Sequence, residues 1–183
     1  NIEASVGALV FANAGGLRED NLIYHGRELA NTSEFFRVDG AAAGGAGEIR
    51  LQSISPSGVI APPATTPGVN VLALIGLAGD DLFEFHGPLP YTNTHVQGVD
   101  PDASDVLALA TTTAALNVNY SGSVTGGGYG VIIFDGIEVV SADADGFALS
   151  INGTGDPDVL HYEPTGAAAG TVTADNQNLR VSF

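Results

Sequence analysis

The chain has 183 residues, of which 44% are hydrophobic, enough for one sizeable domain or two small ones. Five basic residues, all arginine, stand against 21 acidic ones, and the net charge of −16 excludes a surface that attracts nucleic acid or an anionic membrane. The chain has no cysteine, which excludes a disulfide framework, thiolate metal ligands and a cysteine nucleophile.

Short β-strands separated by turns are predicted along the whole chain. Apolar and polar residues alternate in short runs rich in β-branched and aromatic side chains, which is the pattern of half-buried strands. Clusters of Gly, Asp, Asn, Pro and Ser between these runs are typical of turns. In chain order, the predicted strands are 22–24, 48–51, 69–74, 82–85, 116–120, 131–134, 147–151, 159–162, 171–173 and 179–183.

Three segments share one pattern, in which a Leu-x-apolar strand is followed by a turn and then by Asp-x-apolar-x-aromatic. They are 9–24, 72–85 and 149–162. Repeats at this scale are typical of solenoids and arrays. We therefore expect a single β domain of three degenerate repeats, covering approximately 1–67, 68–135 and 136–183. The pattern assigns to the core Leu9, Phe11, Leu22, Tyr24, Leu72, Leu74, Phe83, Phe85, Leu149, Ile151, Leu160 and Tyr162.

The fold class predicted from these patterns is all-β. The internal repeat favours a repeat-built, β-solenoid-like structure, in which neighbouring units stack and bury a continuous core. The same short strands also fit a β-sandwich or jelly roll, in which they pair antiparallel across two sheets. Both folds place the alternating apolar residues in the core.

Asp-rich turns separate the strands of these units: Glu19-Asp20, Gly79-Asp80-Asp81 and Gly155-Asp156-Pro157-Asp158. In these three turns the chain resembles the Gly/Asp-rich tandem repeats of bacterial surface proteins, distantly the hemolysin-type (RTX-like) β-solenoid repeats. In those families, Gly-x-Asp turns hold Ca²⁺ through carboxylates and backbone carbonyls. The resemblance therefore implies calcium binding, with Asp80, Asp81, Asp156 and Asp158 as candidate ligands. The alternative is that each Asp caps its turn through its side chain.

A second acidic cluster, residues 100–105, contains three aspartates close together. Ca²⁺ prefers hard oxygen ligands of this kind. Asp100, Asp102 and Asp105 are therefore further candidate calcium ligands, with a solvated acidic loop as the alternative. No cofactor other than calcium is expected.

Catalytic motifs are scarce in this sequence. It has no Gly-x-Ser-x-Gly elbow, and the glycine-rich run at 126–130 is not followed by the helix and lysine of a phosphate loop. We therefore expect that the protein is not an enzyme. Asn31, Asn119 and Asn152 begin Asn-x-Ser/Thr triplets and are candidate glycosylation sites.

The two ends of the chain resemble an internal segment. Residues 180–183 followed by 1–6 reproduce the pattern of 131–140, so we expect 179–183 and 1–6 to be open strand edges that join head to tail. The start lacks signal-peptide features, and we expect a mature or excised chain. The predicted function is an extracellular or cell-surface structural subunit or repeat unit. It would assemble with copies of itself into a filament, sheath or surface layer, without nucleic acid and without membrane insertion.

Two other functions are kept as alternatives. An adhesin or carbohydrate-binding module would need exposed aromatic side chains, and Tyr91, Tyr120 and Tyr129 would have to line one open face. A secreted enzyme on a β-helix scaffold would need carboxylates and arginines in a groove. The arginines close enough in sequence to contribute are Arg27, Arg37 and Arg50.

Overall fold

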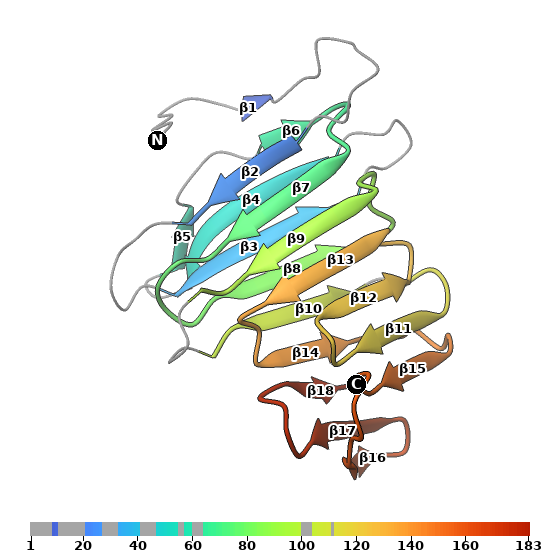
Figure 1. The fold of residues 1–183 in the computed structure, drawn as a ribbon. Coiled ribbons are helices and arrows are strands. Elements are labelled where there is room, and N and C mark those ends of the chain that lie inside the picture. Colours follow the sequence, from blue (N-terminus) through green and yellow to red (C-terminus); the bar gives the residue numbers. More distant parts are fainter. Residues whose placement is uncertain are drawn as a thin grey trace.

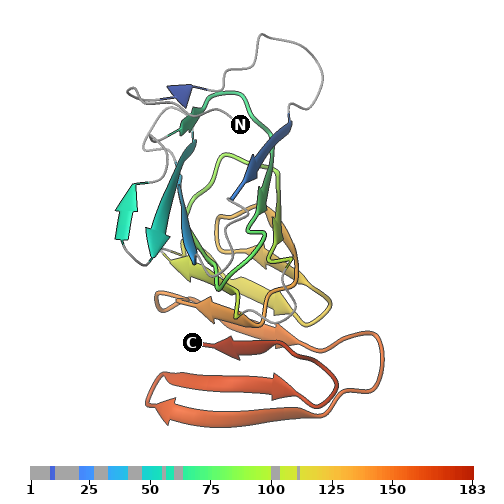
Figure 2. The same ribbon diagram turned by 90° about the vertical axis from the view of Figure 1, so that its left-hand side faces the viewer.

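The computed structural model describes residues 9–10, 21–26, 33–40, 47–54, 57–59, 64–99, 104–110 and 112–183. These residues form two large mixed sheets that face each other (Figures 1 and 2), which confirms the all-β class. None of the described residues lies in a helix, so this part of the chain contains no helix that could span a membrane.

The described strands form one sheet of eleven strands and one of seven. In pairing order, the eleven-stranded sheet contains β1 (Leu9–Val10), β6 (Ala64–Thr66), β4 (Gly47–Ile54), β3 (Glu34–Asp39), β8 (Leu82–His86), β10 (Val106–Ala110), β14 (Val139–Ala142), β18 (Arg180–Ser182), β17 (Ala169–Ala174) and β16 (Leu160–Gly166), with β5 (Ser57–Val59) beside β4. The seven-stranded sheet contains β15 (Leu149–Asn152), β11 (Leu116–Asn119), β12 (Ser123–Gly126), β13 (Val131–Asp135), β9 (Asn93–Gln97), β7 (Val71–Ile75) and β2 (Asn21–His25).

Successive strands cross between the sheets and return beside earlier strands. In the seven-stranded sheet β2, β7, β9 and β13 pair in parallel, and in the eleven-stranded sheet β3, β8, β10, β14 and β18 do the same. The chain passes from β2 to β3, from β7 to β8, from β9 to β10 and from β13 to β14, each time from the smaller sheet to the larger. Antiparallel hairpins such as β3–β4, β11–β12 and β16–β17 interrupt this order.

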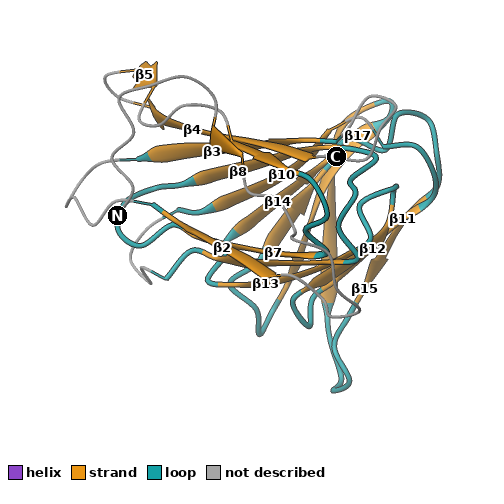
Figure 3. Cartoon of the chain, turned by 90° about the horizontal axis from the view of Figure 1, so that it is seen from above, coloured by secondary structure: helices purple, strands orange, loops and turns teal. Residues whose placement is uncertain are grey.

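The core lies between the two sheets, which Figure 3 shows from above. It forms because apolar residues alternate with polar ones along each strand and so share one face. In β8, Phe83 and Phe85 are fully buried, whereas the intervening Glu84 is only partly buried. The ring of Phe83 stacks on that of Phe36 in β3, with centroids 4.8 Å apart. Parallel pairing therefore places aromatic residues of neighbouring strands in one layer.

Most of the predicted core is confirmed where its side chains are described. Leu72, Leu74, Phe83 and Phe85 are buried, and Leu22, Tyr24, Leu149 and Ile151 are partly buried against them. The prediction is wrong for Leu160 and Tyr162, which are 44% and 59% exposed. Both lie on β16, which extends past β15, the last strand of the facing sheet (Figures 1 and 2). Leu9 and Phe11 lie outside the described side chains.

The pairing register differs from the alignment suggested by the sequence repeat. Leu22 of β2 pairs with Leu72 of β7, whereas the repeat pattern equated Leu22 with Phe83. The repeat pattern therefore aligned β2 with β8, whereas in the structure β2 pairs with β7, one strand earlier in the chain. The shift arises because alternating apolar residues look the same in strands of either sheet.

The strand at 179–183 is not an open edge, and that expectation is wrong. β18 pairs with β14 on one side and with β17 on the other, because the hairpin β16–β17 precedes it and adds to the sheet beyond it. Among the described strands, the edges are instead β1 and β16 in the eleven-stranded sheet and β2 and β15 in the seven-stranded sheet. Residues 1–6 lie outside the described residues.

Candidate functional site

Four acidic residues occupy equivalent corners of the fold, where the chain enters the eleven-stranded sheet. We call Glu34, Asp81, Asp105 and Glu138 the corner acids. Glu34 begins β3, and the other three immediately precede β8, β10 and β14. Because these strands pair side by side in parallel, the corner acids form a row along one side of the sheet.

Three of the corner acids accept a hydrogen bond from the backbone N–H of the preceding acid in the row. The N–H of Glu34 donates to Oδ1 of Asp81, and the N–H of Asp81 donates to Oδ1 of Asp105, both over 2.8 Å. The N–H of Asp105 donates to Oε2 of Glu138, also over 2.8 Å. The carboxylates thus satisfy buried N–H groups at the strand starts, as buried backbone donors require.

A glycine earlier in the chain packs closely against each of three corner acids. A Cβ atom on Gly26 would lie 2.2 Å from Oε2 of Glu34, and one on Gly76 would lie 2.1 Å from Oδ2 of Asp81. A Cβ atom on Gly98 would lie 2.0 Å from Oδ2 of Asp105 and 2.0 Å from the carbonyl oxygen of Gly136. Because these approaches are too close for a real Cβ, all three positions require glycine where the chain passes the carboxyl group.

The row is acidic, and Glu34, Asp81 and Asp105 are buried, whereas Glu138 is only partly buried. Asp81 is 1% exposed, and its Oδ2 has no hydrogen-bond partner among the described residues. Burial, joined by the nearby charges of Asp105, Glu34 and Asp80, raises the pKa of Asp81 to about 7, although the N–H of Glu34 lowers it. This carboxyl group can therefore exchange a proton near neutral pH.

The structure divides the candidate calcium ligands between two places. Asp80, Asp81 and Asp105 meet at the corner, where Oδ1 of Asp80 accepts the N–H of Ser104 over 2.9 Å. Asp156 and Asp158 lie in the turn before β16.

In that turn, Oδ2 of Asp158 accepts the N–H of Thr154 over 2.6 Å, and its Oδ1 accepts the Thr154 hydroxyl over 3.0 Å. These are contacts of the kind expected if the side chain caps its turn. Asp100 and Asp102 lie outside the described residues. Within the described ranges, no group of three or more His, Asp or Glu side chains is arranged to hold a metal ion.

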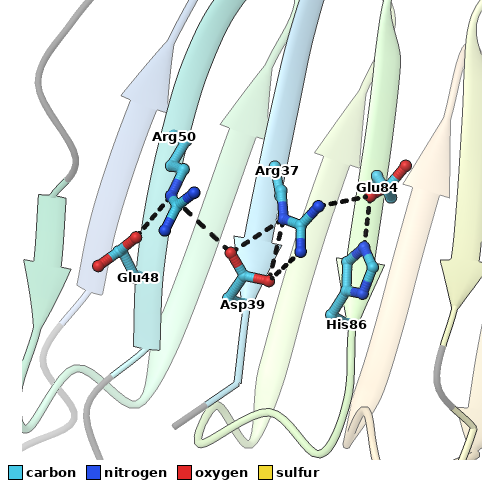
Figure 4. Close-up of polar contacts among 6 residues, drawn as sticks. All are labelled: Arg37, Asp39, Glu48, Arg50, Glu84 and His86. Carbon is cyan, nitrogen blue, oxygen red and sulfur yellow. Dashed lines mark hydrogen bonds and ion pairs between the residues drawn. The ribbon is translucent and has the colours of Figure 1, made fainter.

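A second charged group lies on the outer face of β3 and β8 (Figure 4). Nε of Arg37 donates to both carboxylate oxygens of Asp39, each over 3.0 Å. Nη1 of Arg37 lies 3.5 Å from Oε1 of Glu84, which also contacts Nε2 of His86. The hydrogen bond to Asp39 is the main cause that raises the pKa of Arg37 above its ordinary value.

Arg50 extends this network onto β4. Its Nε lies 2.6 Å from Oε1 of Glu48 and 4.0 Å from Oδ2 of Asp39 (Figure 4). Arg37 and Arg50, two of the three arginines named for the enzyme alternative, are thus bound to carboxylates that link adjacent strands. Arg27, the third, lies outside the described residues.

The tyrosines named for a carbohydrate-binding face, Tyr91, Tyr120 and Tyr129, are all buried. The Tyr120 hydroxyl donates to the carbonyl of Val172 over 2.7 Å, and the Tyr129 hydroxyl donates to the carbonyl of Ala110 over 2.6 Å. These tyrosines therefore brace the interior and do not line an open face.

The C-terminal end of the fold, formed by Val159 and β16, carries exposed apolar side chains. Val159, Leu160 and Tyr162 are 55%, 44% and 59% exposed. The ring of Tyr162 stacks on that of Phe183, with centroids 6.2 Å apart. A cavity of about 600 Å³ in this part of the fold is lined by Phe147, Phe183 and the 141–146 segment, among others. This end therefore combines an edge strand with uncovered apolar surface.

Comparison with family models, curated proteins and solved structures found no match for this chain. The function therefore has to be argued from the corner acids, the outer charged network and the C-terminal end.

Sequence reasoning did not group the corner acids, although a signal was present. Glycine at the end of one strand is followed, after a short turn, by an acid and an apolar run, as in Gly76 to Asp81 and Gly98 to Asp105. Aligning these glycine–acid pairs would have found the row. The repeat pattern instead aligned Asp81 with Asp20 and Asp158.

Proposed function

We propose that this protein is a structural subunit that associates with copies of itself through open sheet edges, as part of an extracellular filament, sheath or surface layer. The observation that carries the proposal is the C-terminal end. There β16 has no described strand on its outer side, and no described strand of the facing sheet covers it (Figures 1 and 2). Open strand edges with exposed apolar side chains are surfaces that pair with another chain.

The direction of the edge strands also supports assembly. Between β1 and β16 the pairing is antiparallel at four steps, β6–β4, β4–β3, β18–β17 and β17–β16. Between β2 and β15 it is antiparallel at two steps, β13–β12 and β12–β11. An even number restores the direction, so both edges of each sheet run the same way. A translated copy is therefore compatible with parallel addition, which is what head-to-tail assembly requires.

The finer fold that suits this function is a solenoid-like stack of two-strand coils. The coils would be β2–β3, β7–β8, β9–β10 and β13–β14, with the hairpins as insertions. Parallel pairing of the coils and the recurrence of the corner acids support this interpretation. In stacks of this kind each unit contacts only its neighbours, so the end units present surface that needs a cover.

Sedimentation velocity over a concentration series tests the proposal. Leu160→Gln removes an apolar group from the C-terminal end without a change of charge. Ile133→Gln is a matched control on β13, because both residues are 44% exposed. We expect the wild-type chain to form larger species as concentration rises. We expect Leu160→Gln to weaken association about tenfold, since burying a leucine contributes about 1.5–3 kcal/mol.

The control should associate like the wild-type chain. Equal weakening by both variants would show that the C-terminal end is not the contact. A wild-type chain that stays monomeric at millimolar concentration and moderate salt would overturn the proposed function.

A further inference from the structure

We propose that two copies of the chain join tail to tail, with β16 of one copy antiparallel to β16 of the other about a two-fold axis at Tyr162. This inference rests on the proposed self-association and specifies the contact at the C-terminal end. Its partner is a second copy of this chain. Its evidence is the pattern of backbone donors and acceptors and of apolar side chains along β16.

The hydrogen bonds of β17 show which of its backbone groups face β16. The N–H of Asp175, just after β17, donates to the carbonyl of Val159 over 3.2 Å. Gly170 exchanges hydrogen bonds of 2.8 and 3.0 Å with Phe183, beyond β18 on the other side of β17. Backbone groups alternate sides along an antiparallel strand. The odd-numbered residues of β17 therefore face β16, and the even-numbered ones face β18.

The same alternation applies to β16, in which His161 pairs with Thr173 and Glu163 pairs with Thr171. The backbone groups of His161 and Glu163 thus face β17. Those of Leu160 and Tyr162 face the open edge. Pro164 is next in the edge-facing series, and proline is tolerated there because its missing N–H takes no bond from β17.

A two-fold axis at Tyr162 satisfies both edge-facing N–H groups. Tyr162 lies opposite its counterpart, and the pair exchanges two N–H to C=O bonds. Leu160 lies opposite Pro164 of the other copy, where the Leu160 N–H donates to the Pro164 carbonyl and the Leu160 carbonyl receives no bond in return, because proline has no N–H. Each copy thus donates two hydrogen bonds and accepts two.

The side chains of β16 are complementary in the same register. On the outer face, His161 of one copy lies opposite Glu163 of the other, and the two-fold axis repeats this pair. Nε2 of His161 lies 2.5 Å from Oδ1 of Asp175 in its own chain, so the complementarity of this register lies in the backbone and the inner face. On the inner face, apolar Leu160 meets Pro164, and Tyr162 meets Tyr162.

Single-cysteine variants test the register directly, because the chain has no cysteine of its own. In the proposed pairing, residues 161 and 163 of different copies are a non-hydrogen-bonded pair, with Cα atoms about 4.5 Å apart, within reach of a disulfide. His161→Cys and Glu163→Cys are oxidised separately and as a mixture. Asp135→Cys, at an exposed position on β13, is the control partner. Val10→Cys, on edge strand β1, probes the opposite end.

The mixture of His161→Cys and Glu163→Cys should give about tenfold more disulfide-linked dimer than either variant alone or either with Asp135→Cys. Circular dichroism checks that each variant is folded. Preferential linkage of Glu163→Cys to Val10→Cys would establish head-to-tail order and overturn the inference, while self-association would stand. Association in sedimentation without preferential linkage would also overturn it. A monomeric chain would overturn the proposed function as well.

Discussion

The hydroxyl of Tyr120 donates a 2.7 Å hydrogen bond to the carbonyl oxygen of Val172. Tyr120 directly follows β11 of the seven-stranded sheet, and Val172 lies in β17 of the eleven-stranded sheet. The bond therefore joins the two sheets at the hairpin that carries β16. Through it, the interior holds the C-terminal end in place.

Replacing Tyr120 with Phe should lower the free energy of unfolding by about 0.5–1.5 kcal/mol, because the change removes one buried hydrogen bond and little volume. Tyr162→Phe makes the same chemical change at a side chain that is 59% exposed, and it should have almost no effect. Urea unfolding measures both variants. Equal losses would contradict the bracing role of Tyr120.

Replacing Gly98 with Ala should destabilise the fold by about 1–3 kcal/mol, because the new Cβ would overlap the corner. It would lie 2.0 Å from both the Asp105 carboxylate and the Gly136 carbonyl. Gly155→Ala is the control, since its Cβ would have nothing within 4 Å. Its effect should stay within about 0.5 kcal/mol. Thermal or urea unfolding that ranks the two variants equally would contradict the close packing of the corner.

Asp81 should make the stability of the fold depend on pH. Its pKa in the folded protein is about 7, above the ordinary 3.8, so the folded state binds the proton more tightly than the unfolded state does. The free energy of unfolding should therefore fall as pH rises from about 4 to about 7, and this contribution should then level off.

Asp81→Asn keeps an oxygen that can accept the N–H of Glu34, and it removes the titrating group. Its unfolding free energy should depend less on pH across that window than that of the wild type. Asp156→Asn, which removes an exposed carboxylate, should keep the wild-type slope. Urea unfolding across the window measures all three chains. Parallel profiles for Asp81→Asn and the wild type would show that Asp81 titrates normally.

Salt should promote association of the wild-type chain. Each copy carries a net charge of −16 with histidine neutral, so electrostatic repulsion between the copies opposes association. Raising ionic strength from about 0.05 M to about 0.5 M shortens the screening length and should strengthen association. Sedimentation at fixed protein concentration measures it. Weaker association at high salt would mean that ion pairs dominate the contact.

Alternation predicted ten of the eighteen described strands, but not their partners. The predicted strand at 82–85 corresponds to β8, and the one at 131–134 corresponds to β13. The strands that were missed are β1, β3, β5, β6, β9, β10, β12 and β14. In β9, for example, Asn93, His95 and Gln97 are polar and Val96 is the one strongly apolar residue. The buried face of β9 is completed by Thr94, whose side chain does not look like core in the sequence.

The corner acids show why the site was harder to predict than the strands. Five positions separate Gly76 from Asp81, and seven separate Gly98 from Asp105, so no fixed spacing marks the row. The parallel pairing absorbs these differences in the turns and brings the acids together. The exposure of Tyr162 could not be predicted from the sequence either. Its alternation with polar neighbours is typical of a half-buried strand, and it does not reveal that the facing sheet ends before β16.

Amide hydrogen exchange of β16 tests the central claim most directly. The N–H groups of His161 and Glu163 face β17 and should exchange slowly at every protein concentration. Those of Leu160 and Tyr162 face the open edge, so they should exchange fast in dilute solution and slow markedly as copies associate. Nuclear magnetic resonance resolves the four amides individually. Concentration-independent exchange at Leu160 and Tyr162, in a sample that sedimentation shows to be associated, would contradict pairing through β16.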